Sequence, residues 1–233
     1  MPTPSEVDDA LARAVLWRFL SLGFASPSVE LRRALTSGAE RRSLDAALER
    51  VGLPPFRHDG EIDLEGPFGE LFGHTLRGKV CPYETEYGSA QVFQQAQELA
   101  DLQGWYAAFG LERRPDVRER ADHIGVESEF IGFLARKEAY TLESGDDGQL
   151  EAVRQAYRSF LRDHLGRFGM AVATGLERWG GGGFYGRLAS LCRALLAVEC
   201  RRLGVRPGPR TLPLCPDLPD SAPAACGGEA EGR

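Results

Sequence analysis

The sequence contains little that would place the protein in a membrane, outside the cell or on nucleic acid. No apolar run approaches the roughly 18 residues that a membrane-spanning helix needs. The N-terminal segment carries Glu6, Asp8 and Asp9 where a secretory signal peptide would carry positive charge. A formal net charge of −6 disfavours binding to a phosphate backbone. We therefore expect a cytoplasmic protein with no nucleic-acid partner and no direct membrane insertion.

Common signatures of catalysis and of cofactor binding are also absent. The chain has no Gly-x-Ser-x-Gly, and its glycine run at residues 180–183 lacks the lysine and hydroxyl residue of a phosphate loop. The five cysteines are too scattered for a disulfide framework and are expected to be reduced thiols: Cys81, Cys192, Cys200, Cys215 and Cys226. We predict no catalytic residue, no cofactor and no metal, and hence a protein that is not an enzyme.

Helical periodicity dominates what is present, because apolar residues recur at steps of three and four along most of the chain. Asp146 or Asp147 is expected to cap one of these helices, and Gly23, Gly52, Gly110 and Gly204 are expected to end others. The expected helical stretches are residues 5–23, 26–52 with a break near 37–38, 64–72, 89–110, 115–135, 146–168, and a last one that ends at 204. Alternating runs of strand length are missing, so the fold class is predicted to be all-α.

Length and composition indicate one globular unit followed by a different tail. A chain of 233 residues with 42% hydrophobic and 27% charged residues can bury a substantial core. We expect a single-domain helical bundle over residues 1–206. Residues 207–233 are rich in proline, glycine, alanine and acidic residues, and we expect this tail to be mobile or loosely draped on the domain.

The first unusual segment joins Phe68-Gly-Glu-Leu-Phe72 to Cys81-Pro-Tyr-Glu-Thr-Glu-Tyr-Gly88. Helix packing alone does not require a loop that combines proline, tyrosine and glutamate. Pro82 stiffens the backbone, Tyr83 offers amphipathic contact area, and Glu84 offers a carboxylate. A binding loop is one interpretation. The other is a well-packed connection whose tyrosines only seal the core.

The second unusual segment is Ala121-Asp-His-Ile-Gly-Val-Glu-Ser-Glu-Phe-Ile-Gly-Phe-Leu134. If it is helical, His123 and Glu127 lie four residues apart and share a face. Such a pair is able to bind a metal, so a helical metal-dependent enzyme is an alternative hypothesis. That site would need further ligands, yet the chain has only four histidines and no second motif of this kind. A His/Glu pair that stabilises the helix is the simpler interpretation.

Together the two segments resemble the TorD/DmsD/NarJ family of redox-enzyme maturation chaperones. That family has an aromatic-x-x-Leu-Phe stretch, then a Pro-aromatic-Glu-Ser-x-Tyr-like loop, and some 35 to 40 residues later an Asp-His-x-x-x-Glu-x-x-Phe helix. Here residues 68–72, 82–87 and 122–130 match in order and separation. Thr85 replaces the usual serine, which keeps a hydroxyl, and Phe68 stands where some members have tryptophan. Ser128 and Glu129 replace a more apolar pair.

The resemblance implies a TorD-like fold and a system-specific chaperone. Such a protein binds the apo form of a molybdopterin-containing oxidoreductase catalytic subunit, through its twin-arginine leader or a vestige of one. It holds that subunit until the cofactor is inserted, as a monomer or a domain-swapped dimer. A groove for the leader needs apolar walls and carboxylates. The residues implied to form it are Phe68, Leu71, Phe72, Pro82, Tyr83, Glu84, Tyr87, Asp122, His123 and Glu127. A generic helical interaction module remains a further alternative.

Overall fold

The computed structural model describes residues 4–57, 63–73, 78–88, 92–112 and 119–215, and within these ranges the only regular elements are helices. The prediction of an all-α fold is confirmed. The helices are α1 (Pro4–Phe24), α2 (Val29–Thr36), α3 (Gly38–Val51), α4 (Glu65–Phe72), α5 (Val92–Ala108), α6 (Ile124–Ser144), α7 (Asp147–Asp163), α8 (Leu165–Trp179), α9 (Phe184–Leu203) and the single turn η1 (Glu84–Glu86). No helix among the described residues is long and apolar enough to cross a membrane.

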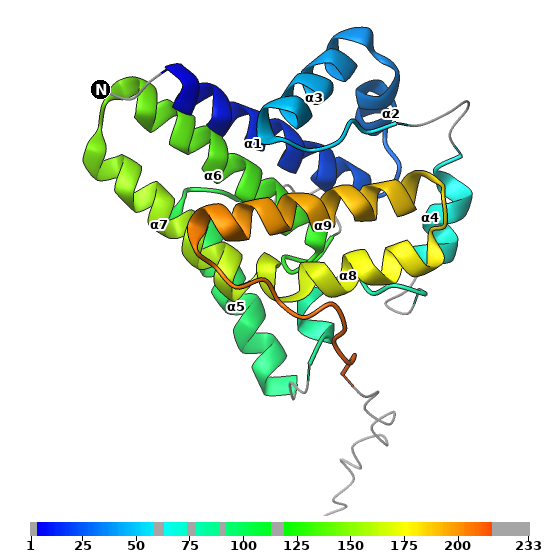
Figure 1. Cartoon of the computed structure of the whole chain (residues 1–233). Helices are drawn as coiled ribbons and strands as arrows, with labels where there is room; N and C mark the ends of the chain where they lie inside the picture. Colours follow the sequence, from blue (N-terminus) through cyan, green and yellow to red (C-terminus); the bar gives the residue numbers. More distant parts are fainter. Residues whose placement is uncertain (1–3, 58–62, 74–77, 89–91, 113–118, 216–233) are drawn as a thin grey trace, which may run out of the picture.

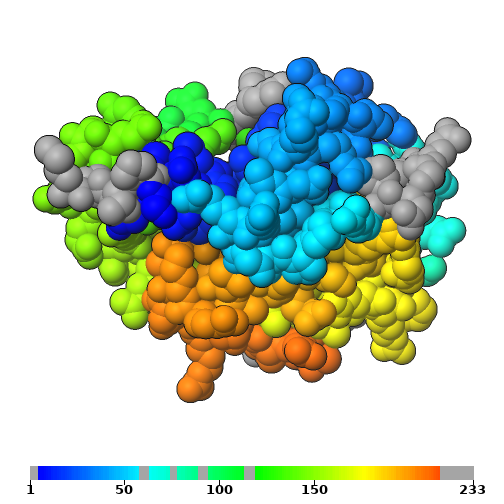
Figure 2. Space-filling view, turned by 45° about the horizontal axis from the view of Figure 1, so that its top comes forward, coloured from blue at the N-terminus to red at the C-terminus, as the bar shows by residue number. Residues whose placement is uncertain are grey.

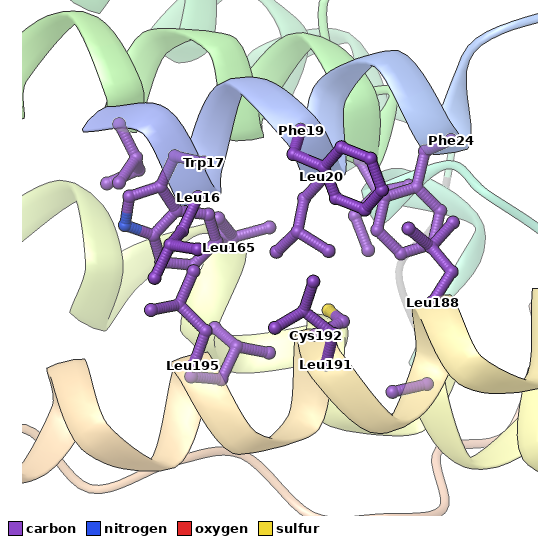
Figure 3. Close-up of a cluster of buried hydrophobic side chains, with 14 of the residues drawn as sticks. Leu16, Trp17, Phe19, Leu20, Phe24, Leu165, Leu188, Leu191, Cys192 and Leu195 are labelled. Atoms are coloured by element: carbon purple, nitrogen blue, oxygen red, sulfur yellow. The ribbon is translucent and has the colours of Figure 1, made fainter. Parts of the chain in front are cut away.

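The centre of the bundle is formed by α1, which lies against α6 on one side and faces α9 on the other (Figure 1). Apolar side chains of α1 such as Leu16 and Leu20 point toward Leu188 and Leu195 of α9 (Figure 3). On the other side, Gly132 permits the close approach of α6, because a Cβ there would lie 3.2 Å from the Cβ of Trp17. The apolar steps seen in the sequence therefore become one continuous core.

A buried polar network joins α1, α6, α7 and α9 beside this core. Trp17 Nε1 donates to the Tyr157 hydroxyl at 2.7 Å, and that hydroxyl donates to the Glu199 carboxylate. Arg13 Nη2 donates to Glu138 Oε2 at 3.1 Å. Because unpaired buried polar groups are costly, this pairing fixes how the helices meet.

Several predicted helix ends are confirmed. Thr36 ends α2 and Gly38 begins α3, Gly52 and Gly204 follow α3 and α9 with positive φ, and the Asp146 side chain caps α7. Gly23, interpreted as a stop, lies inside α1 instead. Its lack of a side chain serves packing, because a Cβ there would lie 2.5 Å from Cδ1 of Leu188.

Three predicted boundaries are wrong. The N-cap of α2 is Ser28, whose hydroxyl accepts from the Leu31 amide, so α2 does not begin at Pro27. The helix expected over 146–168 is divided at His164, whose φ of −122° and ψ of −101° separate α7 from α8. The helix expected from residue 115 is not helical over residues 119–123, which include a turn at 121–122 and the bridge residue His123, and α6 begins at Ile124. Residues 115–118 themselves lie outside the described residues.

The space-filling view in Figure 2 shows the segment after α3 lying across α9. Surface hollows of ≈ 380 Å³ and ≈ 280 Å³ flank residues 53–57 there, and both include Phe56 and Arg57 in their lining. On the other side of the molecule, residues 205–215 run beside α8 (Figure 1). Residues 216–233, including Cys226, lie outside the described residues, so the separate mobile tail stays a prediction. The thiols of Cys81, Cys192, Cys200 and Cys215 are free.

Candidate functional site

The two segments singled out in the sequence meet in space. Residues 82–88 form a loop, called here the 82–88 loop, that pairs with the residues leading into α6. The Ile124 amide donates to the Pro82 carbonyl at 2.8 Å, and the Glu84 amide donates to the Asp122 carbonyl at 2.9 Å. Between these bonds Tyr83 and His123 form an antiparallel bridge. Because the contacts are between backbones, the approach to α6 and the loop form one rigid unit.

Asp122 lies at the centre of this unit and is fully buried. Its Oδ2 accepts from the amide and the hydroxyl of Thr85 at 3.2 and 2.8 Å. The Arg120 guanidinium donates to both of its oxygens, from Nε at 3.0 Å and from Nη2 at 2.8 Å. The Asp122 carboxylate is therefore occupied by its own chain and holds the loop in place. Arg120 was not predicted, since a single arginine before the motif carries no periodic signal.

Glu84 is buried next to this centre and binds the junction between α7 and α8. Its Oε1 accepts from Arg167 Nε at 3.0 Å, and its Oε2 lies 3.1 Å from His164 Nδ1. His164 Nε2 in turn lies 3.2 Å from Asp101 Oδ2. One signal for this contact is visible in the sequence, because a histidine interrupts the apolar stripe of the predicted 146–168 helix at this point. Glu84 and His164 explain why the helix divides there.

Glu127 is fully buried in the first turn of α6. Within the described residues neither carboxylate oxygen has a partner in hydrogen-bonding geometry. Burial raises the pKa of Glu127 well above its usual value, and the charges of Glu84 and Asp122 raise it further. The protonated, uncharged form is therefore favoured, which reconciles a carboxyl group with this position.

His123 does not share a helical face with Glu127, contrary to the sequence interpretation. It is the N-cap of α6, and its Nδ1 accepts from the Gly125 amide at 3.0 Å. Burial lowers the pKa of His123, so the neutral ring is favoured. The ring nitrogen facing the helix is thus engaged, and no group of three His, Cys, Asp or Glu side chains in the described part of the chain is arranged to hold a metal. The geometry gives the metal-dependent alternative no support.

The two loop tyrosines differ in what they contact. The Tyr87 hydroxyl donates to the Cys81 carbonyl at 2.7 Å and its ring packs against Phe168, so it seals the loop. Tyr83 is half-buried, and the Arg120 guanidinium lies over its ring, 4.7 Å from the ring centre. Its hydroxyl donates to Glu119, and burial raises its pKa to about 12. Tyr83 therefore keeps part of its ring available to a partner.

The apolar residues of α4 form a neighbouring cluster. Leu71 and Phe72 are buried, and the rings of Phe68 and Phe72 pack against Tyr185 at the start of α9. One backbone bond ties this cluster to the segment leading into the loop, from the Val80 amide to the Leu71 carbonyl at 2.9 Å. Phe68 is the member that stays partly exposed. Leu71 and Phe72 are buried and therefore contribute to the site only by packing.

Partly exposed carboxylates surround the loop, and we call them the acidic rim. Their side chains are between 26% and 66% exposed: Glu86, Glu98, Asp101 and Glu119. Each has a partner in the chain, such as Arg120 for Glu86 and Arg167 for Glu98. Glu86 belongs to the loop that the sequence singled out, whereas Glu98, Asp101 and Glu119 were not predicted, because single acidic residues are common on any protein surface. The arrangement can present negative charge beside an aromatic ring, while the buried carboxyls remain internal.

Comparison with known proteins places the chain among helical chaperones. Residues 32–173 match the family model described as nitrate reductase delta subunit. The chain is 30% identical over 189 residues to the dimethyl sulfide dehydrogenase assembly chaperone protein of Rhodovulum sulfidophilum, covering 75% of each protein. It is 25% identical to the chaperone protein TorD of Aliivibrio fischeri, covering 59% of this chain and 65% of that protein. With TorD of Vibrio cholerae the identity is 26%, over 74% of this chain and 78% of that protein.

Proposed function

Because the chain belongs to the nitrate reductase delta subunit family, the family of TorD-type maturation chaperones, we propose that it is the dedicated chaperone of one molybdopterin oxidoreductase. Its relatives carry the names of chaperones, and the family is not one of enzymes. The chaperone binds the apo catalytic subunit of its client in the cytoplasm, through a twin-arginine or vestigial leader. It holds the subunit until the cofactor is inserted and assembly or export can proceed.

The observation that carries this proposal is the locked 82–88 loop, which presents Tyr83 next to the acidic rim. A twin-arginine leader brings two guanidinium groups followed by an apolar stretch. Guanidinium groups pair best with carboxylates in a planar, two-pronged geometry. Glu119 accepts a hydrogen bond from the Tyr83 hydroxyl, and Glu86 accepts one from Arg120, whose guanidinium lies over the Tyr83 ring. We assign the contact with the leader arginines to these two carboxylates, and the contact with its apolar stretch to the exposed face of Tyr83.

The residues predicted from the sequence then divide by role. Tyr83 and Phe68 are partly exposed and can touch a client. The others act by holding these two residues and the rim in position, since they are buried or engaged within the chain: Leu71, Phe72, Pro82, Glu84, Tyr87, Asp122, His123 and Glu127. A buried carboxylate that already pairs with arginine would have to break that pair before it could bind a leader, which is unfavourable.

Calorimetry with a synthetic twin-arginine leader peptide from a molybdopterin oxidoreductase tests the proposal. We expect Glu119→Gln to weaken binding about 3- to 10-fold, because the lost contact is charged and partly exposed to water. Tyr83→Ala should weaken it by a similar factor. The matched control is Glu151→Gln, since Glu151 is an exposed carboxylate of α7 outside the rim. Its affinity should equal that of the unaltered protein.

A second peptide distinguishes a leader-specific chaperone from a generic interaction module. Replacing both arginines of the leader by lysine keeps the charge and removes the planar fork. We expect this peptide to bind more weakly than the arginine form, and Glu119→Gln to reduce the difference between them. Equal binding of both peptides, or equal loss in Glu119→Gln and Glu151→Gln, would refute the assignment to the rim.

A further inference from the structure

The described end of the chain returns to the 82–88 loop. After α9 ends, residues 205–215, called here the strap, run beside α8 toward the loop (Figure 1). The Gly208 amide donates to the Gly166 carbonyl at 2.8 Å. A Cβ on Gly208 would lie 1.9 Å from the Arg167 carbonyl oxygen, so only glycine fits this crossing. The strap is thus anchored on α8, next to the arginine that binds Glu84.

The last described residues of the strap pair with the loop as a short β-bridge. Leu214 and Tyr87 form the antiparallel bridge. The Gly88 amide donates to the Pro213 carbonyl, and the Cys215 amide donates to the Glu86 carbonyl, each at 2.8 Å. The loop contributes only backbone groups to these bonds. An edge of this kind accepts an extended peptide largely irrespective of its side chains.

The strap has the same order of chemical features as the proposed ligand. Arg206 and Arg210 are exposed basic residues, and the five residues that follow, 211–215, carry no charge. A twin-arginine leader also presents basic residues first and an apolar stretch afterwards. Leu214 is 53% exposed, so its side chain adds little to the hold. Leu212 packs against the core, whereas residues 213–215 are held at the loop by backbone bonds and the Cys215 thiol. Residues 213–215 are therefore the replaceable part of the strap.

We propose that residues 206–215 form a built-in mimic of the leader, which covers the backbone edge of residues 86–88 until an extended segment of the client displaces residues 213–215. This inference rests on the proposed function, because it names the edge at which the leader binds. Displacement exchanges one pair of backbone hydrogen bonds for an equivalent pair, and the anchor at Gly208 stays in place. The apparent affinity for the client is then reduced by the fraction of time the strap is bound.

Proline at position 215 tests the strap within the full chain. Cys215→Pro removes the amide that donates to Glu86, while Cys215→Ala removes only the thiol and keeps that amide. A synthetic peptide with the sequence of residues 206–215 serves as the probe. Because the strap of Cys215→Pro has lost one of its own hydrogen bonds to the edge, it competes less well with the peptide. We therefore expect the peptide to bind Cys215→Pro about 3- to 10-fold more tightly than Cys215→Ala. The Gly88 amide should also exchange faster in Cys215→Pro, and addition of the peptide should slow it again.

Gly208→Ala provides a second route to the same state, because its Cβ forces the strap away from Arg167. It should strengthen peptide binding as Cys215→Pro does, with unchanged helical circular dichroism. Equal peptide affinity in Cys215→Pro and Cys215→Ala would overturn the inference, as would an unchanged exchange rate at Gly88.

The leader peptide used above separates failure of this inference from failure of the proposed function. If the edge is where the leader binds, Cys215→Pro should bind it more tightly than Cys215→Ala by the same factor as the strap peptide. If the strap peptide binds and the leader peptide does not, both the proposed function and the mimicry are overturned. The edge of residues 86–88 would then pair only with the strap of its own chain. Leader binding that is identical in both variants would overturn the mimicry alone.

Discussion

Removing the Asp122 carboxylate should destabilise the whole protein, because this side chain connects the 82–88 loop to the start of α6. In Asp122→Ala the amide and hydroxyl of Thr85 lose their acceptor in a region with no exposure to solvent. Each buried group left without a partner costs about 1–3 kcal/mol. The Arg120 side chain is 30% exposed and keeps its bond to Glu86, so its share is discounted to at most about 1 kcal/mol.

The expected total is therefore about 2–7 kcal/mol, a range that includes the roughly 3–5 kcal/mol found when one member of a buried ion pair is removed. Asp122→Asn should cost less, about 1–2 kcal/mol, because an amide oxygen can still accept from Thr85 while the charge is lost. The assay is equilibrium unfolding in guanidinium chloride, followed by circular dichroism, with the slope m compared between variants.

Asp45→Ala is the matched control, since Asp45 is an exposed carboxylate on α3. Its free energy of unfolding should lie within about 0.5 kcal/mol of the unaltered protein. If Asp122→Ala is less than about 1 kcal/mol below this control, Asp122 does not anchor the loop and the division between contacting and positioning residues is wrong.

Two further predictions concern Glu127 and the glycines. The pKa of Glu127 in the folded chain is raised above 4.5, so the folded chain binds this proton more tightly than the unfolded chain does. The stability that this proton contributes is lost as the pH rises from 4.5 through the pKa of the folded chain. Glu127→Gln should therefore gain in stability relative to the unaltered protein as the pH rises above 4.5 in denaturant titrations; parallel pH profiles would contradict this. Gly23→Ala should destabilise by about 1–3 kcal/mol through its clash with Leu188, whereas Gly104→Ala, at an open position within α5, should stabilise by about 0.5–1 kcal/mol. Thermal melts of this pair measure the difference, and a loss of stability in both would refute the packing argument.

The helical fold was predictable because its signals are local. A glycine with positive φ, such as Gly52 or Gly204, and a capping side chain such as Asp146 act within one helical turn. Apolar residues at steps of three and four likewise identify the buried face without knowledge of its partner. Gly23 shows the limit of this reasoning. The same residue type that stops a helix also permits close packing, and only the position of Leu188 decides between the two.

The geometry of the site was less predictable because it depends on contacts far apart in the sequence. His123 could be assigned to a helical face only if the helix extended to its N-terminal side, and the backbone pairing of residues 82 and 124 ends the helix at that point instead. His164 divides α7 from α8 where the buried carboxylate of Glu84 approaches, 80 positions earlier in the chain. Neither Arg120 nor the strap had a periodic signal, since each acts through a partner that the chain brings back from elsewhere.

Most residues of the motifs that identify the family are therefore not the residues that we propose to contact a client; Tyr83 and Glu86 belong to both sets. Asp122 and Glu84 hold the loop through partners inside the chain, and Glu127 is sealed beneath them. A buried residue with satisfied hydrogen bonds cannot distinguish one leader from another, because it does not meet either. Discrimination requires exposed groups whose pairing changes with the client, such as Glu119 and the face of Tyr83. Exchanging the rim of this chain for that of a relative should transfer client preference, while exchanging the buried motif residues Glu84, Asp122 and Glu127 should change stability alone.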